Sequence, residues 1–345
     1  MPKSLLFFIL LVFFSELGFS QRKKSKDSQN FTVQQLAPGI WAAIQNDQYG
    51  KAICNAGIID LGDKTIVFDA FMTPQAAREL RTLAEDLTQR PVTIVVNSNF
   101  HNDHIRGNQV FKPYANIISS VYTREQIARV EPGQQEWEKH NAPFLLKAAR
   151  KIYSSATGPD REELPLWIGY YEGMMESADD LKITLPDIVF TDSLWIMGSK
   201  RSVKLVEFRN CHTASDVALF IPSEKIVFMG DLLFVQRHPW LSDGNPANWE
   251  NNLKHFYDDQ SIQIFVPGHG SVCDKKGVKD LCDYFDVVQK LAREADNDST
   301  RSRLLLQPIP AQYQNWYFSR YYQPNLKFLF GTAYKQDSYM MLNPR

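Results

Sequence analysis

The sequence predicts an α/β protein built as a four-layer αβ/βα sandwich with a helical insertion in its middle. Short apolar runs alternate with helix-like segments in the first half of the chain, and this alternation returns over residues 203–266. The stretch between the two halves lacks strand-like runs. Two β-rich halves that each carry helices on one side bury both sheets when the sheets pack face to face. The 345 residues, 44% of them hydrophobic, suit one large domain with an insertion, or one domain plus an appendage.

Strands and helices alternate in the first half. Residues 31–45 and 52–60 alternate like strands. Thr73 is a favourable N-cap and Pro74 suits a first helical turn, so we expect a helix from there to about Leu87. The other elements expected in this half are strands over 65–69, 92–96 and 116–120 and a short helix over 105–111.

The middle of the chain, about residues 122–184, is expected to be a helical insertion because it contains helix-forming stretches such as 136–153. It is rich in aromatic residues and methionines. These side chains either line a substrate pocket beneath a lid or pack the insertion onto the sandwich, and the sequence leaves both readings open. The residues concerned are Trp137, Trp167, Tyr170, Tyr171, Met174 and Met175.

The N-terminus has the pattern of an export signal. Lys3 precedes an apolar run over 5–14, and small residues lie at 18–20. We expect residues 1–20 to be a cleaved signal peptide, which would place the protein in the periplasm or outside the cell with no stable membrane insertion; an uncleaved anchor is the alternative. Residues 21–300 would form the main domain. The aromatic-rich extension 301–345 is expected to dock on the same chain or on a second subunit.

The charge of the chain argues against nucleic acid as a partner. The net charge is −1, and the longest basic run is residues 22–24, whereas proteins that bind the phosphate backbone are usually basic. A small-molecule substrate is expected, and the oligomeric state is not predicted. Four cysteines would meet an oxidising compartment after export. Cys273 and Cys282 are the nearest pair, but the sequence predicts no particular bridge.

The stretch 99–104 carries the most chemistry. It places two imidazoles, a carboxylate and a carboxamide in six residues directly after the apolar run 92–96. A polar turn at the end of a strand is the simpler explanation for one histidine. Two histidines and an aspartate within four residues match the spacing of metal ligands, and imidazole with carboxylate suits zinc, iron or manganese.

Three later residues fit the same interpretation. His212, Asp231 and His269 each follow closely after a short apolar run with β-branched or aromatic residues. Loops at strand ends are where rigid scaffolds present functional groups. We therefore expect these residues to converge with the 99–104 stretch at one edge of a sheet.

These residues resemble the signature of the metallo-β-lactamase-fold hydrolases, which is His-x-His-x-Asp-His followed by a distant His, Asp and His. The resemblance covers roughly residues 35–275. It implies a first metal site of Asn99, His101 and His212, a second of Asp103, His104 and His269, and Asp231 bridging them. It also implies one or two zinc ions, a metal-bound hydroxide as the nucleophile, and Asp103 as the catalytic residue that orients the water or takes its proton.

One position departs from the family pattern. Asn99 stands where the family usually has histidine, and a neutral carboxamide oxygen is a weaker zinc ligand than an imidazole nitrogen. Asn97 cannot replace the missing imidazole, since it is also an amide. We therefore expect the second site to fill first and to bind metal more tightly.

The motif implies a hydrolase but does not select its substrate. We expect an exported enzyme that acts on an ester, lactone, amide or related bond. A β-lactamase proper is an alternative, although dedicated lactamases of this fold usually have Cys or Ser where this chain has Asp231. A second alternative is a catalytically weakened metal- or substrate-binding module, for which Asn99 would be the first sign.

Several further residues have weaker standing. His238 and Trp240 lie shortly after Asp231 in a loop that could reach the site, so both are candidates for substrate binding. Cys211 precedes His212 and is interpreted as a small buried residue facing away from the metal, since neighbours in an extended segment alternate. Asn245 and Trp249 have the same standing as His238, whereas His140 and His255 are expected at the surface.

Overall fold

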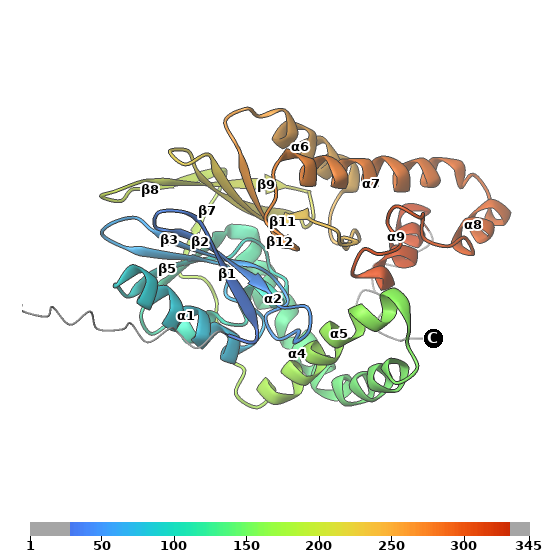
Figure 1. Cartoon of the computed structure of the whole chain (residues 1–345), viewed down its shortest axis with the longest axis horizontal. Helices are drawn as coiled ribbons and strands as arrows, with labels where there is room; N and C mark the ends of the chain where they lie inside the picture. The colour runs from blue at the N-terminus through green and yellow to red at the C-terminus, as the bar shows by residue number, and fades with distance from the viewer. Residues whose placement is uncertain (1–27, 332–345) are drawn as a thin grey trace, which may run out of the picture.

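The computed structural model describes residues 28–331, and the predicted signal peptide over 1–20 lies outside this range. Two β-sheets face each other between two layers of helices, as Figure 1 shows, so the predicted four-layer α/β architecture is confirmed. Between the sheets lies an apolar core that includes Ile59, Phe68, Val96, Val217 and Phe228, all at most 2% exposed. This core fixes the two sheets relative to each other and therefore fixes the loops at their edges.

The first sheet has seven strands in sequence order. Its first four strands pair antiparallel, and β4 to β7 pair parallel. The short β7 was not expected from the sequence, because two of its three residues are exposed and it carries little apolar signal. The strands are β1 (Phe31–Ala37), β2 (Ile40–Gln45), β3 (Ala56–Asp60), β4 (Thr65–Phe68), β5 (Val92–Val96), β6 (Asn116–Ser120) and β7 (Ile188–Phe190).

The second sheet has five strands in the order β12-β11-β10-β9-β8. β11 and β12 run parallel and the other pairs are antiparallel. β8 was also missed in the sequence. The strands are β8 (Ser193–Ile196), β9 (Val203–Arg209), β10 (Ser215–Ile221), β11 (Ile226–Phe234) and β12 (Ile264–His269).

Helices cover the outer faces of both sheets (Figure 1). On the first sheet, α1 (Pro74–Thr88) begins as predicted, because the Thr73 side chain accepts a hydrogen bond from the Ala76 amide. The expected helix over 105–111 is two short helices, α2 (Asn102–Ile105) and α3 (Asn108–Phe111). On the second sheet lie α6 (Pro246–Asp258) and α7 (Lys275–Glu294).

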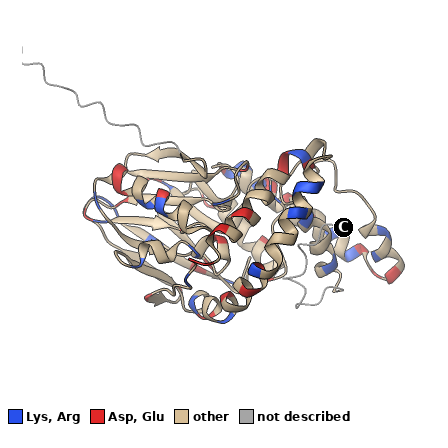
Figure 2. Cartoon of the chain, turned by 90° about the horizontal axis from the view of Figure 1, so that it is seen from below, with Lys and Arg blue, Asp and Glu red and all other residues tan. Residues whose placement is uncertain are grey.

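Two long helices fill the middle of the chain. They are α4 (Val121–Tyr153), which contains Pro132 and Pro143, and α5 (Gly158–Ser177). The expected helix over 136–153 is thus the second half of a longer one that starts directly after β6, where the Ser120 side chain caps it. Among the described residues, no helix is both long and apolar enough to span a membrane. Acidic and basic residues are mixed along the helices (Figure 2).

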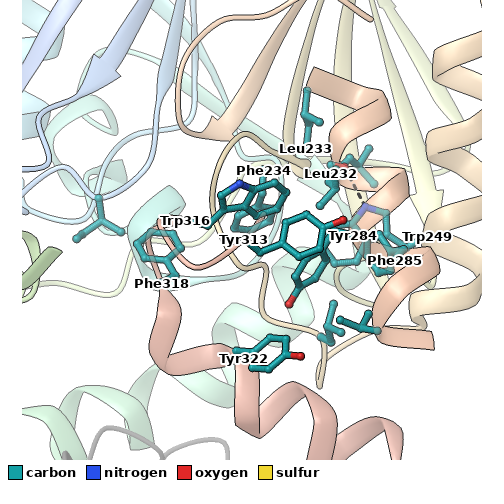
Figure 3. Packing of buried hydrophobic residues seen from close by; sticks show 14 of the residues in the cluster. Leu232, Leu233, Phe234, Trp249, Tyr284, Phe285, Tyr313, Trp316, Phe318 and Tyr322 are labelled. Carbon is teal, nitrogen blue, oxygen red and sulfur yellow. Dashed lines mark hydrogen bonds between the residues drawn. The ribbon is translucent and has the colours of Figure 1, made fainter. Parts of the chain in front are cut away.

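The described C-terminal segment packs on the same chain. The polar run 296–300 contains the start of α8 (Asp298–Leu305), with Asn297 as its N-cap. After it come a 3₁₀ turn (Ser319–Tyr321) and α9 (Tyr322–Leu329). Figure 3 shows aromatic side chains of this segment against α7, where Trp316 stacks on Tyr284 with ring centroids 5.4 Å apart. The extension is therefore part of the core, at least up to residue 330.

Candidate metal centre

Four loops and strand ends bring five predicted ligands together. His101 and His104 lie in the turn after β5, His212 lies between β9 and β10, Asp231 lies within β11, and His269 ends β12. Their ligand atoms form two adjoining groups, each within 4.8 Å, that share Asp231. The predicted convergence of these residues is what the structure shows.

Asp231 reaches this position because its neighbour strand carries no side chain there. A Cβ atom on Gly268 would lie 2.2 Å from Asp231 Oδ1, so any other residue at position 268 would displace the carboxylate. The pairing of β11 with β12 is also irregular from Phe228 to Phe234, which lets the strand turn the aspartate toward the sheet edge.

The first group consists of His101, His212 and Asp231. Asp231 Oδ2 lies 3.1 Å from His212 Nε2 and 3.8 Å from His101 Nδ1. The two imidazole nitrogens are 3.1 Å apart and their rings meet edge to face. Three donor atoms thus surround one point beside one oxygen of Asp231.

The second group lies at the other oxygen of Asp231. Oδ1 is 3.2 Å from His104 Nε2 and 3.2 Å from His269 Nε2. Asp103 Oδ2 lies 3.5 Å from each of the same two nitrogens. The bridging carboxylate and the complete second donor set expected from the sequence are therefore arranged around a common point.

Two observations show that this donor set fits a cation. His104 Nε2 and Asp231 Oδ1 are buried and have no hydrogen-bond partner within residues 28–331, which is costly unless a further group lies between them. Burial alone would raise the pKa of Asp231, but His104, His269 and His212 outweigh it and hold the pKa well below its usual range. Two imidazoles with two carboxylates form a donor set that zinc accepts.

The electrostatics of the histidines agree. Burial lowers the pKa of His101, yet hydrogen bonds to Asp231 and Asp243 outweigh burial and raise the pKa to about 10. Burial likewise opposes the charge on His104, and the carboxylate of Asp231 is the largest influence that raises its pKa. The carboxylates therefore favour positive charge at the positions where a metal ion would sit.

The four imidazoles differ in which group, if any, contacts the ring nitrogen that faces away from Asp231. His104 Nδ1 lies 2.8 Å from Asp69 Oδ2, and His269 Nδ1 lies 3.1 Å from the Ile53 carbonyl oxygen. His101 Nε2 lies 3.1 Å from Asp243 Oδ2. The Nδ1 atom of His212 has no partner among the described residues. Such contacts fix the ring orientation and tautomer of a metal ligand.

Asn99 occupies the position of the missing histidine, but its side chain bonds to the backbone of the turn. Its side chain is fully buried, and Oδ1 accepts a hydrogen bond of 2.8 Å from the His101 backbone amide. The carboxamide therefore holds the turn that carries His101 and adds no imidazole to the first group.

No pattern in the sequence predicted a place in the site for Cys54, but the structure places it beside the second group. Its Sγ lies within 4.8 Å of ligand atoms of Asp103 and His104 and donates to the Asp103 carbonyl oxygen at 3.0 Å. Burial raises the pKa of this thiol to about 12, so it stays protonated. Cys211 instead faces α6, where Asn252 Nδ2 donates to its Sγ at 3.5 Å, in agreement with the interpretation of a residue turned away from the metal. All four cysteines are free, including Cys273 and Cys282.

A cavity of about 860 Å³ opens over both groups. Its wall comes from the metal-binding loops, one face of α4, α5, the later part of the loop after β11, and the C-terminal segment. Trp240 lines it, as expected for a residue that contacts substrate. So do Trp137, Trp167 and Tyr170 of the insertion, whereas Met174 is packed in the core and Met175 is exposed. Trp137, Trp167 and Tyr170 thus line the cavity, while Trp167 and Tyr170 also pack in the buried core together with Tyr171 and Met174.

His238 does not line this cavity, which corrects the expectation that it would contact substrate. It is fully buried, with Nδ1 3.2 Å from the Tyr284 hydroxyl and Nε2 3.1 Å from the Tyr313 carbonyl oxygen. Burial lowers its pKa to about 4. The C-terminal segment covers this part of the loop, which sequence proximity to Asp231 could not reveal.

Asn245 and Trp249 also have structural roles. The Asn245 side chain caps α6, and Trp249 Nε1 donates to the Leu232 carbonyl oxygen at 2.9 Å, the bond dashed in Figure 3. Trp249 also packs behind one of the candidate ligands, since its ring centroid lies 5.0 Å from that of His212. His140 and His255 are exposed, as predicted.

A buried polar network ties the metal-binding turn to the insertion. Asn102, between two ligands, donates to Glu138 of α4 and to the hydroxyl of Tyr170 of α5, both at 3.0 Å. Arg106 forms ion pairs with Glu138 at 2.5 Å and with Glu131 at 3.0 Å. The insertion therefore holds the turn as well as walling the cavity. The bonded partners lie 25 to 68 residues apart in the sequence, so no short-range pattern predicts these contacts.

Comparison with known proteins agrees with this geometry. The sequence model of the metallo-beta-lactamase superfamily matches residues 49–271. A metallo-beta-lactamase from Pontibacter korlensis superposes with a TM-score of 0.54 at 15% identity, over 74% of this chain and 99% of that one. The crystal structure of the DIM-1 metallo-beta-lactamase gives a TM-score of 0.52 at 10% identity, over 75% and 98%. The chain therefore belongs to the metallo-beta-lactamase superfamily of metal-dependent hydrolases.

Proposed function

We propose that this protein is an exported zinc-dependent hydrolase that cleaves an ester, lactone, amide or related bond of a small molecule. The observation that carries the proposal is Asp231, whose two oxygens each face a separate pair of imidazoles at the floor of one cavity. The second zinc ion would be held by Asp103, His104, His269 and Asp231, and the first by His101, His212 and Asp231.

Zinc bound there would polarise the substrate carbonyl and lower the pKa of a water molecule to about 7. The protein's own groups supply the rest. Asp103 lines the cavity with Oδ2 3.5 Å from the nearest imidazole nitrogens, so this oxygen would contribute to the second site. The other oxygen of the same carboxylate would orient the attacking water or accept its proton. Asp69 and the Ile53 carbonyl keep His104 and His269 in orientation. The aromatic residues of the cavity exclude bulk water around the scissile bond.

Chelation followed by zinc titration tests this proposal. Protein stripped of metal should regain activity on a panel of chromogenic lactone, ester, lactam and phosphodiester substrates as zinc is restored. Asp103→Ala should stay inactive even at zinc concentrations that load the remaining ligands of both sites. Anomalous diffraction at sub-stoichiometric zinc should show the second site occupied before the first. Tight zinc binding without turnover on any substrate would instead support the weakened binding module, and turnover of lactams alone would support a β-lactamase.

Export is the part of the proposal that rests on sequence alone. Secretion of the full-length protein, followed by N-terminal sequencing of the mature form, should give Gln21 as the first residue. An intact N-terminus in a membrane fraction would support the anchored alternative.

A further inference from the structure

Five aromatic side chains form one continuous wall of the cavity. Trp240 contacts Tyr321 with ring centroids 5.4 Å apart, Tyr321 contacts Phe318 at 5.7 Å, Phe318 contacts Trp167 at 5.5 Å, and Trp167 contacts Tyr170 at 5.7 Å. All five line the cavity, and we call them the aromatic wall. They come from α5, from the loop after β11 and from the C-terminal segment, so three distant parts of the chain build one apolar surface.

The aromatic wall adjoins both groups of metal ligands. The Phe318 ring meets the His269 imidazole edge to face at 5.2 Å. At the other end, Trp240 Nε1 donates to Asp243 Oδ2 at 3.0 Å, and that same oxygen lies 3.1 Å from His101 Nε2. A substrate whose scissile bond lies over Asp231 therefore places its neighbouring group against these rings.

The aromatic wall is held rigidly in place. Glu163 of α5 accepts hydrogen bonds from the Ser319 amide at 3.2 Å and hydroxyl at 2.9 Å. The Arg320 guanidinium stacks 3.8 Å from the Trp167 ring and donates to the Tyr171 hydroxyl. Phe318 has a φ of 62°, a backbone conformation that bulky L-residues rarely adopt. A surface fixed in this way needs no ordering when a ligand binds, which favours affinity.

The charges in the cavity select against an anionic substituent. Arg129 is the only lysine or arginine among the described residues that line the cavity, and it lies exposed on α4 with its guanidinium bonded to Gln126 Oε1. The carboxylates of Glu138 and Asp243 line the same space. Glu138 is already paired with Arg106, and Asp243 with His101. A carboxylate placed against the aromatic wall would therefore lose its hydration without meeting an unpaired buried cation among the described lining residues.

We propose that the substrate carries an uncharged, flat apolar group, of which an aromatic ring is the best fit, next to the bond that is cleaved. The aromatic wall binds this group by offset and edge-to-face contacts. This inference rests on the proposed hydrolase function and names the class of substrate that the same site takes.

Matched substrates test the inference. We would compare ethyl 3-phenylpropanoate with ethyl acetate and with the anion monoethyl succinate, and γ-phenyl-γ-butyrolactone with γ-butyrolactone, by measuring acid release from the zinc-loaded protein. The phenyl compounds should show kcat/KM at least about tenfold higher than their small counterparts, and the anion the lowest value. Equal rates within each pair would overturn the inference and leave the proposed function standing.

A binding measurement separates the inference from the hydrolase proposal. Metal-free protein should bind 3-phenylpropanamide, seen as a change in tryptophan fluorescence or as heat, and should bind propanamide far more weakly. This result without hydrolysis of any substrate would support the aromatic wall and contradict the hydrolase. No difference between the two amides would overturn the inference.

Three variants assign the effect to the aromatic wall. Tyr321→Ala removes the ring that contacts both Trp240 and Phe318 and should lower the preference for phenyl substrates by about tenfold, whereas Tyr321→Phe keeps the ring and should preserve the preference. Tyr317→Ala is the matched control. Tyr317 lies in the same segment and packs on Arg237 with its ring 4.3 Å away, but it does not line the cavity, so the preference should persist. Loss of preference in the control alone would contradict the proposal.

Discussion

The two metal-ligand groups share Asp231 but differ in what supports them. In the second group the His104 side chain is fully buried and paired with the buried Asp69, and His269 rests on a backbone carbonyl. In the first group the His101 side chain is 21% exposed and pairs with Asp243, itself 31% exposed. His212 Nδ1 has no partner there among residues 28–331.

The number of ligands and the contacts that hold them both predict that the second group binds zinc more tightly than the first. The second group offers two imidazoles and Asp103 beside the bridging carboxylate, and the first offers two imidazoles alone. Contacts to the far nitrogen of a ligand change metal affinity by about 10- to 100-fold. The better-held imidazoles of the second group should therefore widen the difference in zinc affinity that Asn99 creates between the two groups. The second group is thus the better supported of the two, and a single carboxylate joins them.

Asp231→Ala should have the largest effect, because it removes the one residue that both groups use. Bound zinc should fall below one ion per chain, and hydrolysis should drop by about a thousandfold or more, which corresponds to about 4 kcal/mol of transition-state stabilisation. Elemental analysis and kcat/KM measure the two effects. Retention of one tightly bound ion would show that the second group does not need the bridge and would break the comparison.

Paired substitutions of the supporting carboxylates should separate the two groups. Asp69→Asn should weaken zinc at the second group by about 10- to 100-fold, and Asp243→Asn should weaken it at the first by a similar factor. Cobalt substitution followed by absorption spectroscopy reads each site without relying on turnover. If both variants altered the same site, the assignment of support to each group would be wrong.

His238 gives a reference imidazole that is buried and has no carboxylate partner in the described part of the chain. Its pKa of about 4 in the folded chain lies below the ordinary 6.5, so the unfolded chain binds the extra proton between these values. The free energy of unfolding should therefore fall as the pH drops, by about 2 kcal/mol from pH 7 to pH 5 from this residue.

Denaturant unfolding of the metal-free protein and of His238→Gln at both pH values measures this contribution as a difference, since the ligand histidines titrate in both proteins. His101 and His104 behave in the opposite sense, because their carboxylate partners raise their pKa values. Equal pH dependence in the two proteins would show that His238 is not held neutral.

The donors of both groups could be predicted from the sequence, but their supports could not. His212 and His269 follow short apolar runs, and such runs predict strand ends where ligands gather. Asp69 and Asp243 lie 35 and 142 residues from the imidazoles they hold, and only the register of β4 on β5 and the path of the loop after β11 bring them near.

Contacts between distant residues, which local sequence patterns do not predict, also explain the error over His238 and the two missed strands. Proximity to Asp231 in sequence suggested a residue in the cavity, whereas packing by Tyr313 and Tyr284 decides where the imidazole lies. β7 and β8 are short and half exposed, so their residues carry little apolar periodicity, and pairing with β6 and β9 defines them. Fold class follows from local patterns, and details at the edges follow from tertiary contacts.

Asn99→His should have the smallest effect. It tests directly whether the missing imidazole causes the difference in zinc affinity between the two groups. A third imidazole at the first group should raise its zinc affinity by about tenfold, since imidazole is the better zinc ligand. The gain is limited because the Asn99 carboxamide now accepts the His101 amide, and the new side chain gives up that bond. Isothermal titration of zinc should then show two steps of more similar affinity. Asn97→His is the matched control: Asn97 bonds to Asn108 and to the His104 carbonyl, so it should not strengthen the first group. Unchanged steps in Asn99→His would mean that the supports, rather than the missing imidazole, set the difference between the two groups.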